Sequence, residues 1–593
     1  MDIYFIKKHI NFKSLIKRLS QKITATSCVF TNKLRGVGKK MEKIKVTLLG
    51  QATQEYDKDI KLSDLAALFP NPNPRFQTLG ATVNNVVHCL QCSLHSDSTV
   101  EFLTYKNREG QEIYRRSLSA VLTCAVFELY RNSRMIIGHS LGNAYYYSLN
   151  TDVPVGDEII AEISAKMNEI VQRDMQFEKQ TLPKDEAEEL FKKLGYPDKV
   201  RLIRYMPYNE VTIYRLGNYV DIEYGALVPS TGYVKFFELN KYNTGIILRF
   251  PEPINPTQIS PIKNWNKLFS VYRESKAWGA ILNINNIGRL NEFASHKKIF
   301  DIIKIQEALH EKKIAIIADE ISKRSDEVKL ILIAGPSSSG KTTFSKRLSV
   351  QLMVNGLNPI ALSLDNYFLN HEQSPVDEDG NLDFECIKAL DLELLNSQLI
   401  DLLKGKEVQI PEYDFKTGKR KSTTKPLRIS ENTCIIMEGI HGLNDELTSS
   451  VPAHNKFRIY ASALTQLCID DYNRIPTTDT RLIRRMVRDA KFRGYSAKDT
   501  ISRWPSVRRG EERNIFPFQE NADIMFNSAL IYELSVLKQF AEPLLREITI
   551  EDKEYHEARR LLKFLELFLP IGYEEIPPTS ILREFISGSS FKY

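Results

Sequence analysis

The stretch LILIAGPSSSGKTTFSKRL, residues 330–348, constrains the fold more than any other part of the chain. An apolar run that is typical of a buried strand leads directly into Gly335–Thr342, and a segment with helical spacing follows. The pattern G-x-x-x-x-G-K-T needs glycine at both ends, because side chains there would block phosphate oxygens from the inward-turned N–H groups. The sequence therefore predicts a strand, a phosphate-binding loop and a helix of an α/β domain.

Each part of this loop has an expected role. Lys341 reaches the terminal phosphates of a nucleotide, and the Thr342 hydroxyl binds Mg²⁺. The helix that begins here adds the partial positive charge of its N-terminus. The expected cofactors are ATP and Mg²⁺, and the residues expected to bind the nucleotide are Gly335, Pro336, Ser337, Ser338, Ser339, Gly340, Lys341, Thr342 and Thr343.

Four further apolar runs fit parallel strands of the same sheet. They are NPIALSLD, NTCIIMEG, KFRIYAS and ADIMFNS. Two of them end in a carboxylate, Asp365 and Glu438, at the strand edge where such sheets bind ligands. An acid at a strand end is common on protein surfaces, but two beside a phosphate-binding loop favour Mg²⁺ binding or proton transfer.

A stripe of arginines follows the fourth strand. Arg481, Arg484, Arg485 and Arg488 are spaced to share one face of one helix. This pattern favours a lid that closes over phosphates and stabilises the transferred charge, with Arg493 on the loop beyond. The alternative is a solvated charged face paired with Asp479 and Asp489.

The segments GPSSSGKTT, SLDNYF, PEYDFKTGKRK, IIMEGIHGL and DTRLIRRMVRDAKFRG occur in the order and approximate spacing of one known family. Residues 328–550 thereby resemble the uridine kinase and phosphoribulokinase family. The resemblance implies that Asp365 is the base toward the substrate hydroxyl and a Mg²⁺ ligand, that Glu438 is the second metal-side carboxylate, that Asp383 holds ribose hydroxyls and that Tyr413 lies near the nucleobase.

We expect Lys341, Arg485 and Arg488 to act in catalysis by neutralising the developing charge. Arg485 is also expected at the substrate, and Arg493 at the nucleotide. Two positions depart from the family pattern: the base-reading His falls on Gly418, and a later lid Arg falls on Tyr495. Phosphoryl transfer survives these changes, whereas pyrimidine specificity does not follow from the sequence.

The front half resembles parts of another enzyme. Residues 41–105, with KIKVTLL, LSDLA and VEFL, resemble the small α+β TGS domain. Residues 106–300, with HSLGNAYYYSL and YVDIEYGALVPSTGYV, resemble the α+β second domain of threonyl-tRNA synthetase, which edits mischarged tRNA. Of four polar positions that this resemblance requires, His139 remains, while Asn143, Glu223 and Leu227 occupy the others. We therefore expect a domain that keeps the fold without hydrolytic or metal-binding chemistry.

The remaining segments complete the expected organisation. Residues 1–40 carry ten Lys or Arg and one acid, and form a basic leader: either a targeting peptide or an upstream extension before Met41. The Pro-rich stretch PEPINPTQISPIKNW is interpreted as a connecting segment. Residues 301–327 are expected to form a helical connector, and residues 551–593 a C-terminal helical extension. Cys89 and Cys92 form a lone C-x-x-C pair, which is read as core thiols rather than a zinc site.

Composition narrows the function classes. The net charge of +7 is concentrated in the leader, so RNA binding by the front domains is open but not favoured. No apolar run approaches the roughly eighteen residues of a membrane span, so we expect no membrane partner. Seven scattered cysteines suggest a reducing compartment, so we expect a cytoplasmic protein. We also expect a homo-oligomer. The expected function is an ATP-dependent kinase for the 5′-hydroxyl of a ribonucleoside such as uridine or cytidine. The alternatives are a kinase for another sugar-type hydroxyl and a nucleotide-dependent RNA- or tRNA-sensing regulator.

Overall fold

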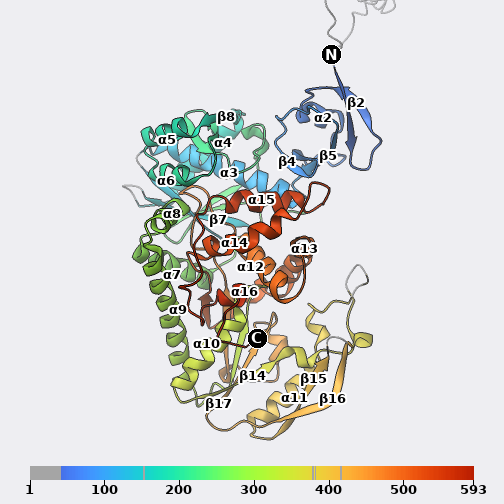
Figure 1. The fold of residues 1–593 in the computed structure, drawn as a ribbon, viewed down its shortest axis with the longest axis vertical. Helices are drawn as coiled ribbons and strands as arrows, with labels where there is room; N and C mark the ends of the chain where they lie inside the picture. Colours follow the sequence, from blue (N-terminus) through green and yellow to red (C-terminus); the bar gives the residue numbers. More distant parts are fainter. Residues whose placement is uncertain are drawn as a thin grey trace, which may run out of the picture.

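The computed structural model describes residues 42–592, except for 132, 151–153, 377–379, 381, 415 and 416 (Figure 1). The expected basic leader lies outside the described residues. Within them, no helix is both long and apolar enough to cross a membrane.

The first domain is a five-stranded mixed sheet with one helix. Its strand order is β2-β1-β5-β3-β4, and β1 pairs in parallel with β5. Every second residue of β1 is buried, which gives the domain a core of its own around Val46, Leu65 and Val100. The elements are β1 (Lys43–Leu48), β2 (Gln54–Asp57), α2 (Leu62–Leu68), β3 (Thr78–Val83), β4 (Val86–His88) and β5 (Ser98–Thr104). The expected α+β architecture is confirmed.

The second domain packs two antiparallel sheets around the long helix α3 (Arg108–Leu129), most of whose inner residues are buried. One sheet has the order β11-β12-β7-β6 and the other β10-β9-β8. The strands are β6 (Arg134–Ser140), β7 (Ala144–Asn150), β8 (Glu178–Pro183), β9 (Glu210–Leu216), β10 (Tyr219–Ile222), β11 (Glu238–Tyr242) and β12 (Gly245–Arg249), and the helices are α4 (Asp157–Gln172), α5 (Lys184–Lys193) and α6 (Pro197–Tyr205).

A helical connector joins the two halves of the chain. After the Pro-rich segment come α7 (Asn266–Leu282), α8 (Ile287–Ser295) and α9 (Ile299–Ser322), and α9 packs along the helix that follows the phosphate-binding loop. The halves also meet at a buried ion pair: Lys199 Nζ lies 2.5 Å from Asp221 Oδ1 and 2.9 Å from Asp470 Oδ2, and Asp470 belongs to the C-terminal half. Fully buried charges of this kind are tolerated only when paired.

The C-terminal half is built on a five-stranded, all-parallel sheet with the order β14-β17-β13-β18-β19. These strands coincide with the runs expected from the sequence, and the α/β fold is confirmed. They are β13 (Leu330–Ala334), β14 (Asn358–Ser363), β17 (Thr433–Glu438), β18 (Lys456–Ser462) and β19 (Ile524–Asn527). Around them lie α10 (Lys341–Val354), α11 (Leu392–Leu403), α12 (Thr477–Phe492), α13 (Ala497–Asn514), α14 (Glu533–Arg546) and the hairpin of β15 (Val408–Asp414) and β16 (Lys419–Leu427).

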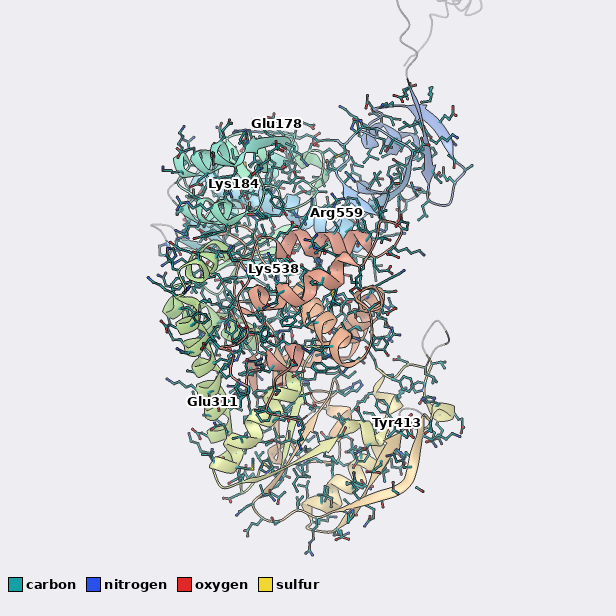
Figure 2. The ribbon with its side chains drawn as sticks, in the orientation of Figure 1. Glu178, Lys184, Glu311, Tyr413, Lys538 and Arg559 are labelled. Atoms are coloured by element: carbon teal, nitrogen blue, oxygen red, sulfur yellow. The ribbon has the colours of Figure 1, made fainter. Side chains whose placement is uncertain are left out.

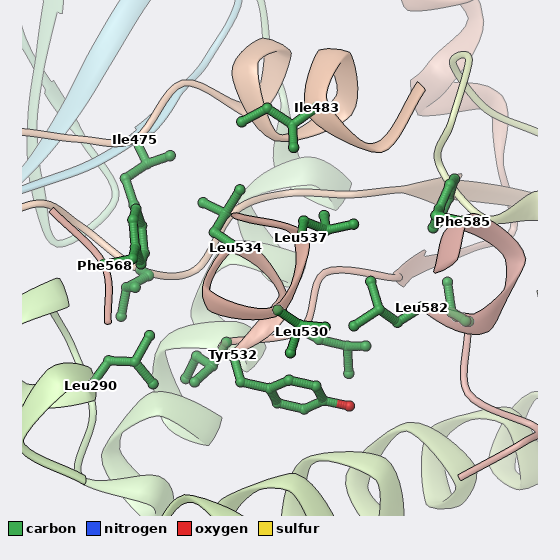
Figure 3. Packing of buried hydrophobic residues seen from close by; sticks show 14 of the residues in the cluster. Leu290, Ile475, Ile483, Leu530, Tyr532, Leu534, Leu537, Phe568, Leu582 and Phe585 are labelled. Carbon is green, nitrogen blue, oxygen red and sulfur yellow. The ribbon is translucent and has the colours of Figure 1, made fainter. Parts of the chain in front are cut away.

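The chain finishes with α15 (Tyr555–Leu565) and the short α16 (Arg583–Ile586), which packs on α12. Figure 3 shows Leu582 and Phe585 among the buried side chains near Leu530 and Leu537 of the C-terminal half. One hydrophobic core therefore includes both the sheet of the C-terminal half and the extension that follows it.

Candidate active site

The loop between β13 and α10 has the geometry that its glycines predict. A Cβ on Gly335 would lie 1.9 Å from the carbonyl oxygen of Ala461. Gly340 has φ +79° at the start of α10, and a Cβ there would lie 2.5 Å from Cγ2 of Ile581. Only glycine avoids both clashes, so the loop can turn its backbone N–H groups inward.

Lys341 folds back over its own loop. Its Nζ donates hydrogen bonds to the carbonyl oxygens of Gly335, at 2.8 Å, and Pro336, at 3.2 Å. Burial lowers the pKa of Lys341 to about 8, although the charges of Glu438 and Glu584 oppose this shift. An added phosphate would favour the ammonium form and offer it a stronger acceptor than neutral carbonyls.

Two side chains with oxygen donor atoms lie together at the carboxyl edge of the sheet. The Thr342 hydroxyl donates to Glu438 Oε1 at 3.0 Å, while Glu438 Oε2 is buried with no hydrogen-bond partner among the described residues. Burial raises the pKa of Glu438, against the pull of Lys341 and Thr342. A hydroxyl and an orphaned carboxylate oxygen beside a phosphate-binding loop fit Mg²⁺, which takes one or two carboxylates plus substrate phosphates.

Asp365 lies one strand farther along the same edge. Ser363, the last residue of β14, pairs with Glu438 of β17, and Asp365 follows two residues later in a 3₁₀ turn. Neighbouring protein atoms partly desolvate the carboxyl group of Asp365, and this desolvation raises its pKa. The order β14-β17-β13 therefore brings Asp365, Glu438 and the loop to one edge, as the sequence predicts.

Residues 330–534 match the model of the Phosphoribulokinase / Uridine kinase family. This match confirms the resemblance for that part of the chain, which is a P-loop kinase-like domain. Two solved structures cover about a third of the chain: a possible uridine kinase from Bacillus stearothermophilus (19% identity, 35% of this chain, all of that one, TM-score 0.23) and a protein assigned as a fructose transport system kinase from Silicibacter sp. TM1040 (18% identity, 36% of this chain, 98% of that one, TM-score 0.26).

The chain is also similar to curated proteins of a different activity, the threonine–tRNA ligases. A threonine–tRNA ligase from Acetivibrio thermocellus is 33% identical over 197 residues, which are 33% of this chain and 31% of that protein. The corresponding ligase from Caldanaerobacter subterraneus is 30% identical over 204 residues, 34% of this chain and 32% of that protein. The chain thus spans about a third of the length of these relatives, and the synthetase-like resemblance is confirmed at that level.

The arginines of α12 divide into two pairs in the kinase-like domain. Arg481 and Arg484 are buried: Arg481 pairs with Glu511 of α13 and donates to the carbonyl of Ser337 at 2.9 Å. Arg484 pairs with Glu533 of α14 and reaches the carbonyl of Ser338 at 3.3 Å. These two brace the phosphate-binding loop through its carbonyls.

Three other arginines converge on one carboxylate. Arg485 Nε lies 3.2 Å, Arg488 Nη2 3.0 Å and Arg493 Nη1 3.6 Å from Asp489, which is buried. Arg485 also donates to the Ser337 hydroxyl at 2.8 Å, so this group borders the loop. Three guanidinium groups around one carboxylate leave positive charge for an anion. The expected partner Asp479 instead pairs with Arg560 of the extension, at 2.7 Å and 2.8 Å.

The residues that we expect to bind the phosphoryl acceptor lie on two neighbouring segments. Asp383 Oδ1 accepts from the backbone N–H of Glu385 at 3.1 Å, and Arg513 Nη1 lies 3.7 Å from Asp383 Oδ2. Burial, followed by the charge of Asp383, raises the pKa of Glu385. Tyr413, a residue of β15 that Figure 2 labels, has its ring centroid 5.7 Å from that of Phe368.

Sequence reasoning missed several residues at this site. His441 follows the Glu438 strand and is buried beside Asp383 and Glu385; burial lowers its pKa to about 4. Its place in IIMEGIHGL was a usable signal, because it follows a strand-end carboxylate by three residues. Glu511, Glu533 and Glu584 had no local signal, since each is far in sequence from the loop.

The four editing-type positions of the second domain have structural contacts. His139 is buried on β6, where burial lowers its pKa to about 3, and its ring meets that of Tyr272 at 5.1 Å. Asn143 donates to the carbonyls of Phe250 and Pro251. The remaining two positions hold Glu223, paired with Lys179 at 2.8 Å, and the buried Leu227.

Proposed function

We propose that the protein is an ATP-dependent kinase that transfers the γ-phosphoryl group to a hydroxyl of a small polyhydroxylated acceptor, specifically the 5′-hydroxyl of a ribonucleoside. The observation that carries this proposal is the contact between Thr342 and Glu438, with Lys341 beside it and Asp365 on the adjacent strand end. This set supplies a phosphate cradle, oxygen ligands and a base within one edge of a sheet.

In the proposed reaction the loop N–H groups and Lys341 bind the phosphates, and Thr342, Glu438 and Asp365 hold Mg²⁺. When bound, Mg²⁺ neutralises charge on the phosphate oxygens. Asp365 accepts the proton of the acceptor hydroxyl while the new O–P bond forms and the bond from the γ-phosphorus to ADP breaks. Arg485, Arg488 and Arg493 surround Asp489 and stabilise the charge carried by the transferred group.

The acceptor side supports a ribose with an attached ring. Asp383 and Glu385 are carboxyl groups that can accept hydrogen bonds from sugar hydroxyls, and Arg513 Nη1 lies 3.7 Å from Asp383 Oδ2. Tyr413, Phe368 and Phe384 form a chain of aromatic contacts at 5.7 Å and 5.9 Å, which suits a planar base. Together these groups favour a ribonucleoside as the substrate class.

One observation favours a different sugar as the second candidate. The ring of His371 fills the space that a side chain on residue 418 would enter: a Cβ on Gly418 would lie 2.2 Å from its Cε1. His371 therefore occupies the space into which the family's base-reading side chain would project from residue 418, so the contact that selects a pyrimidine is not available at that position.

A coupled measurement of ADP release tests both candidates. The purified full chain is incubated with MgATP and one acceptor at a time, from a panel of ribonucleosides, deoxyribonucleosides and free sugars, and products are identified by mass spectrometry. We expect a 5′-monophosphate from at least one ribonucleoside, and far slower formation of that product with Asp365→Asn. A sugar phosphate as the main product would select the second candidate. ADP release that is independent of every acceptor would reject both.

A further inference from the structure

The C-terminal extension reaches the nucleotide loop from outside the family match, which ends at residue 534. Ile581 contacts the position of Gly340, and the carboxylate of Glu584 lies at the start of α10. Figure 1 shows α16, which carries Glu584, inside the C-terminal half rather than on an extended tail. The loop is therefore bordered by residues that lie 241 positions beyond it.

Glu584 holds donors that a phosphate-binding loop offers to anions. Its Oε2 accepts from the backbone N–H of Thr343 at 3.2 Å and from the Thr343 hydroxyl at 2.7 Å. Thr343 is the third residue of α10, so its N–H is one of the four at the helix start that have no partner within the helix. Such N–H groups bind phosphate oxygens, and a carboxylate is chemically equivalent as an acceptor.

The cationic side chains near Glu584 are the ones that a nucleotide phosphate would meet at the same place. The negative charge of Glu584 raises the pKa of Lys341 and of Arg493, in both cases against the larger effect of burial. Glu584 thus neutralises two cations of the proposed nucleotide site as well as occupying one of its N–H donors. A nucleotide phosphate and this carboxylate repel each other and compete for the same donors.

The backbone that carries Glu584 is fixed. Ile581, Leu582 and Phe585 are buried, Lys491 Nζ donates to the carbonyl of Ile586 at 2.9 Å, and the Arg484 guanidinium lies 5.1 Å from the centroid of the Phe585 ring. Glu584 itself is half-buried. The carboxylate can therefore leave Thr343 by side-chain rotation, without unfolding of the extension.

We propose that Glu584 is a further residue of the nucleotide site, where its carboxylate competes with nucleotide phosphate for Thr343. This inference rests on the proposed function, because it takes the loop as an ATP site. It makes Glu584 a determinant of nucleotide affinity: each binding event displaces the carboxylate, and each release lets it return.

Calorimetric titration of the full chain with MgATP, MgADP and inorganic tripolyphosphate tests the proposal. Glu584→Gln removes the charge and keeps the shape, and Glu584→Asp keeps the charge but withdraws it from Thr343. Glu575→Gln, an exposed glutamate of the same segment, is the matched control. We expect Glu584→Gln to bind all three ligands about tenfold more tightly, Glu584→Asp to lie between it and wild type, and Glu575→Gln to equal wild type.

Thermal unfolding of each variant shows whether the fold is kept. If Glu584→Gln does not fold, the ligand affinity of Glu584→Asp still tests the inference. Equal or weaker binding by the folded Glu584 variants, with ATP bound normally by wild type, would overturn this inference and leave the proposed function standing. Absence of ATP binding by all four proteins would overturn both.

Discussion

Arg484 and Glu533 form a buried pair in which Nε donates to Oε2 at 2.9 Å, and the same guanidinium reaches the carbonyl of Ser338 in the phosphate-binding loop. Both side chains are almost completely buried. This arginine therefore belongs to the scaffold of the loop, although it shares a helix with arginines that border the anion site.

Arg484→Met is expected to lower the free energy of unfolding by about 3–5 kcal/mol, because Glu533 is left buried without its partner. Urea unfolding followed by circular dichroism measures the loss. Arg428→Met, at an exposed position, serves as the control and is expected to change little. The double variant Arg484→Met/Glu533→Leu is expected to recover part of the stability; a double variant as unstable as the single one would argue against the pairing as the cause.

Lys341→Ala is expected to abolish phosphoryl transfer and leave the fold intact, because the glycines that shape the loop remain. Within the part of the chain that the structure describes, the ammonium group donates hydrogen bonds to loop carbonyls, at 2.8 Å and 3.2 Å, so its removal breaks no hydrogen bond to a distant segment there. ADP release and thermal unfolding are measured together, with the exposed Lys312→Ala as control. Full turnover by Lys341→Ala would contradict the assignment of this loop as the phosphate site.

Asp365→Asn is expected to reduce kcat by ~10²–10⁴-fold from loss of the positioned base, with a further loss from the Mg²⁺ site. ATP affinity is expected to change little. Steady-state kinetics with the best acceptor separate the two effects, and the exposed Asp326→Asn provides a carboxylate control. A variant with weaker ATP binding and unchanged kcat would assign Asp365 to binding alone.

The pH profile gives an independent test of Asp365. The base acts only when deprotonated, and its pKa is raised above that of an ordinary carboxyl. Activity is therefore expected to fall as pH decreases through the pKa of Asp365, which desolvation raises above 3.8 and which bound Mg²⁺ would lower. The measurement is kcat from pH 4 to 8, and an acid limb that persists in the residual activity of Asp365→Asn would belong to another group.

Stability at acid pH is expected to depend on buried histidines. Burial lowers the pKa of both His139 and His310 to about 3, whereas an unfolded histidine titrates near 6.5. Between these values the unfolded state binds more protons, so stability falls as pH decreases below 6.5, by about 1.4 kcal/mol per pH unit for each histidine. His310→Phe is expected to flatten this dependence in urea unfolding at pH 7, 6 and 5, and the exposed His454→Gln is expected to leave it unchanged.

The local features of the kinase domain were predictable from the sequence. The loop motif fixes its own conformation within eight residues, and the strands that end at Asp365 and Glu438 are continuous apolar runs, as buried parallel strands are. The spacing of the arginines correctly put four of them on α12. It did not reveal that Arg481 and Arg484 turn to carboxylates 30 and 49 residues away, because such partners are set by the packing of α13 and α14.

The front half was predictable at the level of its fold and less so in its contacts. The alternation in KIKVTLL gave a strand with one buried face, as found in β1. The Pro-rich segment 251–265 gave no hint that its Trp265 and the helix α7 would lie over β7 and β12, where Phe269 meets Tyr146 at 4.9 Å. Those contacts depend on side chains brought together from distant segments, which periodicity does not encode.

The position of Glu584 also sets an order of events during synthesis. Thr343 emerges from the ribosome 241 residues ahead of Glu584, which at 5–20 residues per second is a delay of roughly 10–50 s. Ile581, Leu582 and Phe585, which complete the core around the loop, arrive at the same late moment. A nascent chain therefore exposes an unfinished phosphate cradle, and any nucleotide present during translation meets that loop before its competing carboxylate exists.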